Sequence, residues 1–296
     1  VTIFEGKDQL GGVLRYGIPE FRLPKSVLDD IKYRHIDMKG IKFRPNTHIG
    51  GAIGIDDLFR DGYKAIFVGT GVWKPNSLHI KGETFGNVHF GINYLNNPDS
   101  YHLGKRVIVI GAGNAAMDVA RTAIRKGVQE LTCFSITKKV AASQHEFSYA
   151  QLEGVQFEYN KAPVEITDDG VIFKDIIEHE DGTFTDVPDS HHFYPADSVI
   201  ISISQGPQNR IVNTTKGLTA DNRGLLIADE TGHTTRPGIF ASGDVVNGAR
   251  SRIALRSSVF LLHFTSAVLP HWLPLSPVLL PEVHSNIPPV TLPEAS

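Results

Sequence analysis

The chain has 296 residues, of which 41% are hydrophobic and 21% are charged, a globular composition with enough residues for two domains. The formal net charge of −3 argues against a nucleic-acid or membrane-surface partner held by bulk charge. The sequence has one cysteine, Cys133, so these residues cannot form a disulfide framework, a CxxC redox pair, a cysteine-ligated zinc site or an iron–sulfur cluster. Cys133 lies in an apolar run, and we interpret it as a buried small hydrophobe in a protein of the reducing cytoplasm.

Targeting and membrane signals are weak. The first residues lack the basic stretch and apolar core of a signal peptide. Residues 257–281 are uncharged and long enough to span a membrane, but prolines, serines and two histidines interrupt them. We therefore reject a membrane span.

The first hundred residues predict short elements joined by turns. In chain order we expect a strand at 1–5 that ends in Glu5, a helix from Pro24 to Gly40, a short helix near 56–60, a strand at 65–68, the turn Gly69-Thr70-Gly71 and a polar linker at 96–102. The glycines of the turn would let a ligand approach the backbone.

The pattern then restarts as a βαβ unit and continues into shorter strands. We expect a doubly covered strand at 106–110, a helix ending near Gly127, a strand at 131–136, a hairpin around Asp181-Gly182, a buried strand at 198–203 and a last strand at 238–242. After Gly248 the sequence has no glycine, and seven of its 17 prolines lie in the final 46 residues. We predict that this tail, from Ser251, is irregular or disordered.

The sharpest local signal is a GxGxxA motif directly after the strand at 106–110 and opening a helix. Gly111 permits the tight turn, Gly113 lets a pyrophosphate reach the backbone, and Ala116 lets helix and strand pack closely. The helix N-terminus offers free N–H groups and the positive end of a dipole. This context favours a dinucleotide site over a plain turn.

The end of the next strand indicates which nicotinamide cofactor binds. An acid there would hold the adenosine ribose of NAD, but this strand ends in Lys138 and Lys139. Two lysines are suited to a 2′-phosphate, which favours NADP(H); a solvated lysine pair is nearly as good an interpretation. Glu5 is the same kind of ribose-binding signal for a second dinucleotide, with its glycine loop expected ~20 residues upstream.

Residues 11–24, GGVLRYGIPEFRLP, resemble the glutamate synthase small-subunit family, which includes the flavin half of dihydropyrimidine dehydrogenase. The resemblance continues through residues 66–71, 111–121 and 196–197 and the run 243–249, and covers roughly residues 1–250. It implies an α/β fold of two Rossmann-like dinucleotide-binding domains, with an NADPH domain inserted into a discontinuous FAD domain.

The resemblance also implies site residues. Glu5 would bind the flavin's adenosine ribose, and Gly12, Val13 and Arg22 would lie along the FAD. Asp244 would hydrogen-bond the ribityl–pyrophosphate region, where Gly243 lets the backbone approach. The NADPH pyrophosphate would be held by the motif residues Gly111, Ala112, Gly113, Asn114 and Ala115, with Lys138 at the 2′-phosphate.

Three departures from the family pattern bear on these expectations. The family's first strand and glycine loop for FAD are not in the sequence, so we expect an N-terminally truncated, incomplete FAD domain. Ser135-Ile136-Thr137 stands where the family has a Tyr-Arg-Arg-like run. After Ala249-Arg250 a proline-laden tail replaces a Thr-led helix, and its composition is typical of an out-of-frame translation.

We therefore expect an FAD domain at 1–98 and 232–296 with an NADPH domain inserted at 99–231. The predicted function is a flavin oxidoreductase module that passes electrons from NADPH through FAD to an iron–sulfur partner, as in the glutamate synthase small subunit. The expected partner is an iron–sulfur-containing or glutamate synthase large-subunit-like protein. The alternative is a catalytically inactive fragment that binds NADP(H) only. A single-chain disulfide reductase is excluded because a second cysteine is absent.

No catalytic acid or base is assigned, because hydride transfer between nicotinamide and flavin relies on stacking and orientation. His145-Glu146 resembles an acid–base couple. We interpret it as a solvated helix start.

Overall fold

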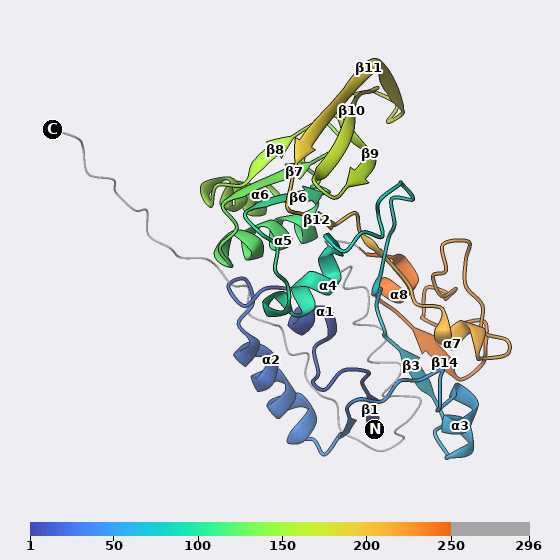
Figure 1. Ribbon diagram of the computed structural model, residues 1–296. Coiled ribbons are helices and arrows are strands. Elements are labelled where there is room, and N and C mark those ends of the chain that lie inside the picture. Colours follow the sequence, from blue (N-terminus) through green and yellow to red (C-terminus); the bar gives the residue numbers. More distant parts are fainter. Residues whose placement is uncertain (250–296) are drawn as a thin grey trace. The chain divides into compact units, whose positions relative to one another are not determined.

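The computed structural model describes residues 1–249 (Figure 1). The predictions about the tail from Ser251 therefore concern residues outside this range, as does most of the expected second part of the FAD domain, 232–296. The helices of the described chain are α1 (Gly12–Tyr16), α2 (Lys25–Lys32), the π-helix η1 (Tyr33–Asp37), α3 (Ile55–Arg60), α4 (Gly91–Asn96), the 3₁₀ helix η2 (Pro98–Ser100), α5 (Asn114–Arg125), α6 (Gln144–Leu152), α7 (Arg210–Asn213) and α8 (Asp244–Asn247).

A five-stranded parallel sheet forms the largest layer, in the order β5-β12-β6-β7-β8. Its strands are β5 (Val88–Phe90), β12 (Ser198–Ile201), β6 (Arg106–Ile110), β7 (Glu130–Phe134) and β8 (Gln156–Glu158). Side chains alternate across a strand, so β6 sends Val107 and Val109 to one face and Ile108 and Ile110 to the other. All four are 3% exposed or less, which confirms the predicted doubly covered strand.

The two faces of this sheet are covered by different layers. On the first face, Val107 and Val109 pack in one core with alanines and other apolar residues of α5 and with Ala150 of α6. On the second face, Ile108 and Ile110 pack against the antiparallel sheet β11-β10-β9. Cys133 of β7 is fully buried in the first core, and burial raises the pKa of its thiol, as expected for a structural cysteine.

The covering sheet confirms the predicted hairpin. Its strands are β9 (Lys161–Thr167), β10 (Gly170–Glu178) and β11 (Phe184–Pro195), all antiparallel. Asp181-Gly182 lies in the turn between β10 and β11, and Gly182 adopts the positive φ of +80° that this turn requires. Figure 1 shows the hairpin extending beyond the other strands of the layer.

The remaining strands of the described chain form three two-stranded sheets. These are the parallel pair β1 (Thr2–Phe4) and β2 (Lys42–Arg44), the parallel pair β3 (Ile66–Val68) and β14 (Ile239–Ala241), and the antiparallel pair β4 (Lys74–Pro75) and β13 (Gln205–Gly206). A third core joins α3, β3, β14 and α8 with Leu218 and Leu226. The expected helix from Pro24 begins as α2 and continues as η1, with Pro24 as its N-cap.

The sheet and the cores cross the domain limits expected from the sequence. Strand β5 precedes residue 98, yet it pairs with β12 in the five-stranded sheet. Leu218 and Leu226 precede residue 231, yet they pack in the core around α3 and β14. Both differences arise from long-range pairing, which local composition does not encode, and the limits at 98 and 231 stay predictions.

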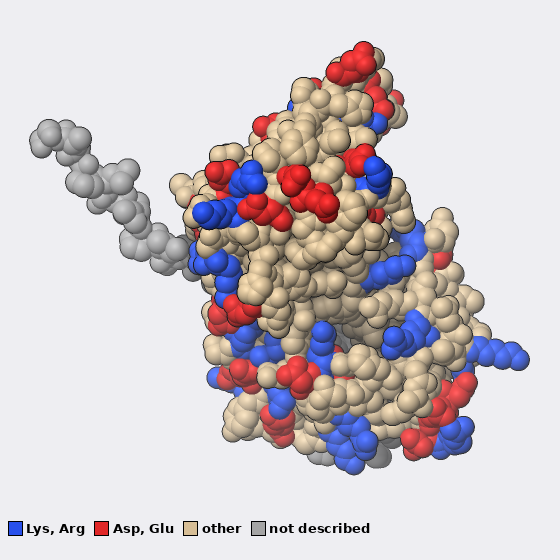
Figure 2. Space-filling model, viewed as in Figure 1, with Lys and Arg blue, Asp and Glu red and all other residues tan. Residues whose placement is uncertain are grey.

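Charge is spread over the surface in view. Basic and acidic side chains are interspersed on the face shown in Figure 2, in keeping with the small net charge of −3. Within residues 1–249, no helix is long and apolar enough to cross a membrane. The same residues contain no group of three or more metal-ligating side chains placed to hold an ion.

Candidate functional site

The GxGxxA motif lies between β6 and α5, and its first glycine is required by the fold. Gly111 has a φ of +129°, a conformation that side chains with a Cβ rarely adopt. A Cβ there would also lie far inside contact distance of the Ser202 carbonyl oxygen, at the end of β12. Gly111 therefore lets the ends of two neighbouring strands approach each other.

The second glycine faces open space. Gly113 is the N-cap of α5 with an ordinary φ of −88°, and a Cβ built on it meets no atom within 4 Å. The Met117 N–H already bonds to the Gly113 carbonyl, so the amides of residues 114–116 are the helix donors left without a helical acceptor. An anionic group fits this cradle, since the helix dipole and the free amides point toward the same space.

The other motif residues hold this cradle in place. Ala116 is fully buried, and Ala112 is 8% exposed. The Asn114 side-chain oxygen accepts the Ser143 N–H at 2.8 Å, and the Ala112 carbonyl accepts the Ala142 N–H at 3.0 Å. The loop before α6 is thereby tied to the motif, a role for Asn114 that its sequence position did not indicate. Ala115 is half-buried on the first turn of α5.

The loop after β7 carries both signs of charge, because the strand ends at Phe134 and not beside the lysines as expected. Lys138 is exposed, and its ammonium has no partner among residues 1–249. Its backbone N–H donates to Glu178 Oε2 at 2.8 Å, so a carboxylate from the end of β10 lies beside the predicted 2′-phosphate position. The hydroxyls of Ser135 and Thr137 bond to each other at 2.9 Å in the same loop. Sequence reasoning missed Glu178 because it lies 40 residues from Lys138.

Three of the residues predicted for FAD lie on the turns after β1. Glu5 accepts the Lys7 N–H on its carboxylate at 3.0 Å, which fixes the turn that follows the strand. Gly12 opens α1 with a φ of +50°, and Val13 is 44% exposed on the same helix. A Cβ on Gly12 would lie 4.0 Å from the ring of Trp73. This glycine therefore keeps the backbone open to a ligand on the Trp73 side.

A cavity of about 480 Å³ opens beside Trp73. Lys7 and Trp73 line it on one side, and Asn93, Asn96 and Tyr101 contribute from α4 and the residues after it. The Lys7 ammonium donates to Asn96 Oδ1 at 3.1 Å. The cavity's volume is within the range of small-molecule sites, and its lining is mostly polar with Trp73 and Tyr101 as the aromatic residues.

The last predicted flavin residues follow β14. Gly243 has a φ of +79°, and a Cβ built on it meets nothing within 4 Å. Asp244 begins α8, and burial raises the pKa of its carboxyl. The Asp244 carboxylate has no hydrogen-bond partner within the described chain. A partly buried acid beside an open glycine fits a polar ligand group such as a hydroxyl.

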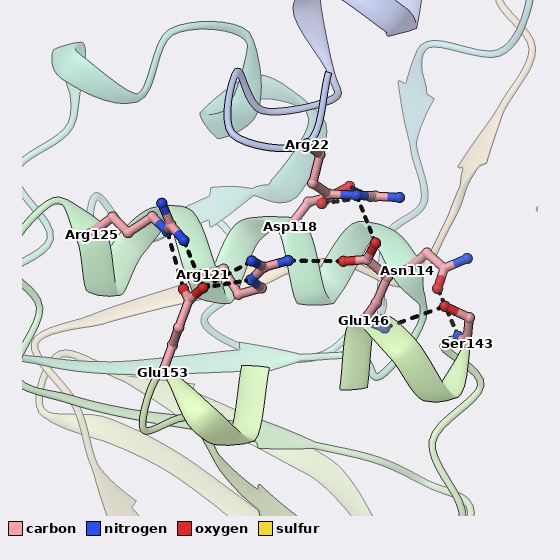
Figure 3. Close-up of polar contacts among 8 residues, drawn as sticks. All are labelled: Arg22, Asn114, Asp118, Arg121, Arg125, Ser143, Glu146 and Glu153. Carbon is pink, nitrogen blue, oxygen red and sulfur yellow. Dashed lines mark hydrogen bonds and ion pairs between the residues drawn. The ribbon is translucent and has the colours of Figure 1, made fainter. Parts of the chain in front are cut away.

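Arg22, also predicted to lie along FAD, has protein partners that the sequence did not reveal (Figure 3). Its Nη1 donates to both Asp118 oxygens, at 2.7 and 2.6 Å, and its Nε lies 2.9 Å from Glu146 Oε1. Burial raises the pKa of Asp118 to about 6, although the hydrogen bond from Arg22 opposes that rise. Arg22 therefore joins the segment before α2 to both α5 and α6.

The interpretation of His145-Glu146 as a solvated helix start is wrong for Glu146. The helix does start there, with Ser143 as its N-cap, and His145 is exposed against Tyr149. Glu146, however, is only 8% exposed and pairs with Arg121 at 3.0 Å as well as with Arg22. The cationic partners come from distant segments, so a local reading of the sequence could not find them.

Comparisons with known proteins identify the family of this chain. A family profile described as pyridine nucleotide-disulphide oxidoreductase matches residues 26–258. The glutamate synthase [NADPH] small chain of Escherichia coli is 30% identical over 279 residues, covering 84% of this chain and 59% of that protein. The NAD-dependent dihydropyrimidine dehydrogenase subunit PreT of Salmonella typhimurium is 29% identical over 257 residues, covering 85% and 58%.

Solved structures show the same fold. Mycobacterium tuberculosis FprA in complex with NADPH superposes with a TM-score of 0.71 at 16% identity, covering 90% of this chain and 78% of that chain. The expected α/β fold with parallel sheets and the family resemblance are both confirmed. The chain spans about three fifths of the length of the two curated relatives.

Proposed function

Because this chain belongs to the pyridine nucleotide-disulphide oxidoreductase family, we propose that it is an electron-transfer module that takes electrons from NADPH and passes them through a bound FAD to an iron–sulfur partner. The relatives support a module of this kind, since one is named as an NADPH-using small chain and the other as an NAD-dependent subunit. Both names belong to components of larger enzymes.

The observation that carries the proposal is the open cradle at Gly113. A Cβ at this position would enter free space directly above the first turn of α5. Neither a close neighbour nor a positive φ requires a glycine at Gly113, and, unlike the equally open Gly86, Gly113 caps α5 beside helix amides that have no helical acceptor. A bound pyrophosphate explains why the position is kept free.

The flavin side of the proposal rests on a second set of open positions. Gly12 and Gly243 leave the backbone accessible, Glu5 and Asp244 offer carboxylates, and Trp73 lines the neighbouring cavity. FAD, when bound, supplies the step from two-electron hydride chemistry to one-electron transfer. The chain's residues would bind and orient the two cofactors, which agrees with the absence of an assigned catalytic acid or base.

The cysteine count supports the proposed partner and compartment. These 296 residues hold one thiol, and Cys133 is fully buried with a raised pKa. Iron–sulfur ligation needs several accessible thiolates. The clusters of the proposed route would therefore lie on a partner or another segment, and a reducing cytoplasm suits both the thiol and the clusters.

The test is a pair of glycine variants. We expect Gly113→Val to weaken NADPH binding at least 100-fold by calorimetry, because the side chain fills the cradle. Gly86→Val is the matched control: Gly86 is exposed, and a Cβ there also meets nothing within 4 Å, so binding should not change. If Gly113→Val binds NADPH with unaltered affinity, the GxGxxA motif is only a structural turn and does not bind the cofactor.

Flavin is tested separately. Flavin absorbance that stays with the protein after excess FAD is removed by gel filtration, and NADPH oxidation with an artificial electron acceptor, should appear together in the protein that binds NADPH. NADPH binding without either signal would support the alternative, a chain that binds NADP(H) only.

A further inference from the structure

A cluster of alternating charges connects the segment that contains Arg22 to the nucleotide-binding helices. It has three arginines and three acids: Arg22 before α2, Asp118, Arg121 and Arg125 on α5, Glu146 on α6 and Glu153 just after it (Figure 3). The charges balance in number. We call these six residues the charge cluster.

The interior of the charge cluster is withdrawn from water. Asp118, Arg121 and Glu146 are 4%, 6% and 8% exposed. Arg121 bonds to Glu146 at 3.0 Å and to Glu153 at 2.9 Å, and Arg125 reaches Glu153 at 2.7 Å. Buried charges persist only where each has a partner, so the geometry of the six groups is mutually dependent.

Arg22 occupies a special place in the charge cluster because it is the member contributed by the first segment of the chain. Its Nη1 contacts both Asp118 oxygens and its Nε contacts Glu146, so one planar group joins α5 to α6. The neighbouring Phe21 ring lies under the guanidiniums of Arg121 and Arg125, at 4.7 and 4.1 Å. Two consecutive residues thereby dock this segment on both helices.

A short path leads from Arg22 to the cradle. The Glu146 carboxylate pairs with Arg22, and the Glu146 backbone N–H donates to the Ser143 hydroxyl at 3.4 Å. Ser143 donates its N–H to the Asn114 side chain, one residue after Gly113. The first turn of α6 therefore carries both the Arg22 contact and the cap that holds the loop against the GxGxxA motif.

We propose that Arg22 is a positioning residue for the nicotinamide-nucleotide site: by holding Glu146 and Asp118 together it fixes the first turn of α6, and through Ser143 and Asn114 it keeps the loop at residues 137–143 closed on the cradle. This inference rests on the proposed function, because it assigns the cradle to NADPH. It gives Arg22 a role at the nucleotide site instead of the flavin contact expected from the sequence.

The test compares two arginine variants. Arg22→Gln removes the charge from the cluster, whereas Arg34→Gln removes an exposed ion pair with Asp30 on the surface of η1 and α2. Hydrogen exchange of the peptide spanning 137–146, measured without ligand, should accelerate about tenfold in Arg22→Gln and stay constant in Arg34→Gln. NADPH affinity should fall about five- to tenfold in Arg22→Gln only, with KM raised and kcat nearly unchanged.

A second pair of variants checks the path. If Arg22 acts through Glu146, the losses of affinity in Arg22→Gln and Glu146→Gln should be less than additive in the double variant. Should Arg22→Gln fail to fold, Arg22→Lys keeps the charge but has one nitrogen in place of the two that contact Asp118 and Glu146, and exchange at 137–146 faster than in wild type is expected.

The outcomes are distinguishable. Unchanged exchange and unchanged NADPH affinity in Arg22→Gln would overturn the positioning role. Loss of flavin absorbance with the same exchange and NADPH affinity as wild type would overturn it too, in favour of a flavin contact. If the wild-type protein binds no NADPH, the proposed function fails, while the exchange measurement still decides whether Arg22 holds the loop.

Discussion

The two dinucleotide-type regions of this chain differ in how their turns are supported. The GxGxxA turn follows β6, whose apolar side chains are 3% exposed or less and which is flanked by β12 and β7. The turn after β1 follows a three-residue, half-buried strand in a two-stranded sheet. The first turn is shaped by the core beneath it, whereas the second is held by polar contacts such as that between Glu5 and Lys7. A site on a deep sheet and a site on surface turns should therefore respond differently to mutation.

The largest difference between the two turns is expected in the free energy of unfolding when one methyl group is added to each turn. Gly111→Ala should lower the free energy of unfolding by about 3 kcal/mol or more, since it combines a glycine-only φ with a clash against the Ser202 carbonyl. Gly12→Ala should cost about 1 kcal/mol, because its φ is +50° and its nearest neighbour is 4.0 Å away. Urea unfolding measures both, and equal losses would break the contrast.

A smaller change in the free energy of unfolding is expected from the titration of Asp118 in the charge cluster. Burial raises the pKa of Asp118 to about 6 from an ordinary 3.8, so the folded protein holds this proton more tightly than the unfolded chain. The stabilising contribution of the protonated form is complete below pH 3.8 and is lost as pH rises through about 6. Arg22, Arg121 and Glu146 face this carboxyl, and Lys25 is close enough to interact.

The measurement is a comparison with Asp118→Asn, which cannot titrate. Relative to this variant, wild type should lose about 1–3 kcal/mol of unfolding free energy between pH 4 and pH 7. If wild type instead gained stability relative to Asp118→Asn as pH rises, the ion pair with Arg22 would outweigh the cost of burying the ionised acid. The expected sign also implies that the burial cost of ionised Asp118 exceeds what its contact with Arg22 returns.

The smallest expected effect concerns cofactor choice at the end of β7. Replacing Lys138 and Lys139 with Ala should weaken NADPH about fivefold and leave NADH nearly unchanged, as an exposed contact to a 2′-phosphate would. Glu178→Gln should strengthen NADPH about threefold, because the carboxylate beside Lys138 repels a phosphate. Equal changes in NADPH and NADH affinity would show that these residues do not contact the 2′-phosphate.

Local signals were sufficient for the part of the fold that surrounds the cradle. Strand β6, the glycine turn and helix α5 follow from apolar residues, glycine spacing and helical composition within 20 positions of one another. The β10–β11 hairpin follows from Asp181-Gly182 in the same way. In each of these elements the residues that decide the structure are sequence neighbours.

Long-range contacts escaped sequence reasoning. Strand β5 joins the sheet through β12, more than 100 residues away, and nothing in Val88–Phe90 specifies that partner. Arg22 meets Asp118 across 96 positions. The one available hint was the spacing of Asp118, Arg121 and Arg125, which places three charges along a helix whose other residues are mostly apolar or small. From the sequence alone, three charged residues in this pattern predict a solvent-exposed helix face, because their partners lie in distant segments.

The burial of Cys133 has a practical consequence. Its thiol lies at 0% exposure in β7 and its pKa is raised, so maleimide reagents, which are attacked by thiolates, should leave the native protein unlabelled. A cysteine introduced at an exposed position such as Lys139 would then take a spin label or a fluorophore alone, without deletion of the native residue. Paired with a second introduced cysteine near Asp30, it would make the separation between the segment bearing Arg22 and the nucleotide-binding loop directly observable by distance spectroscopy in solution.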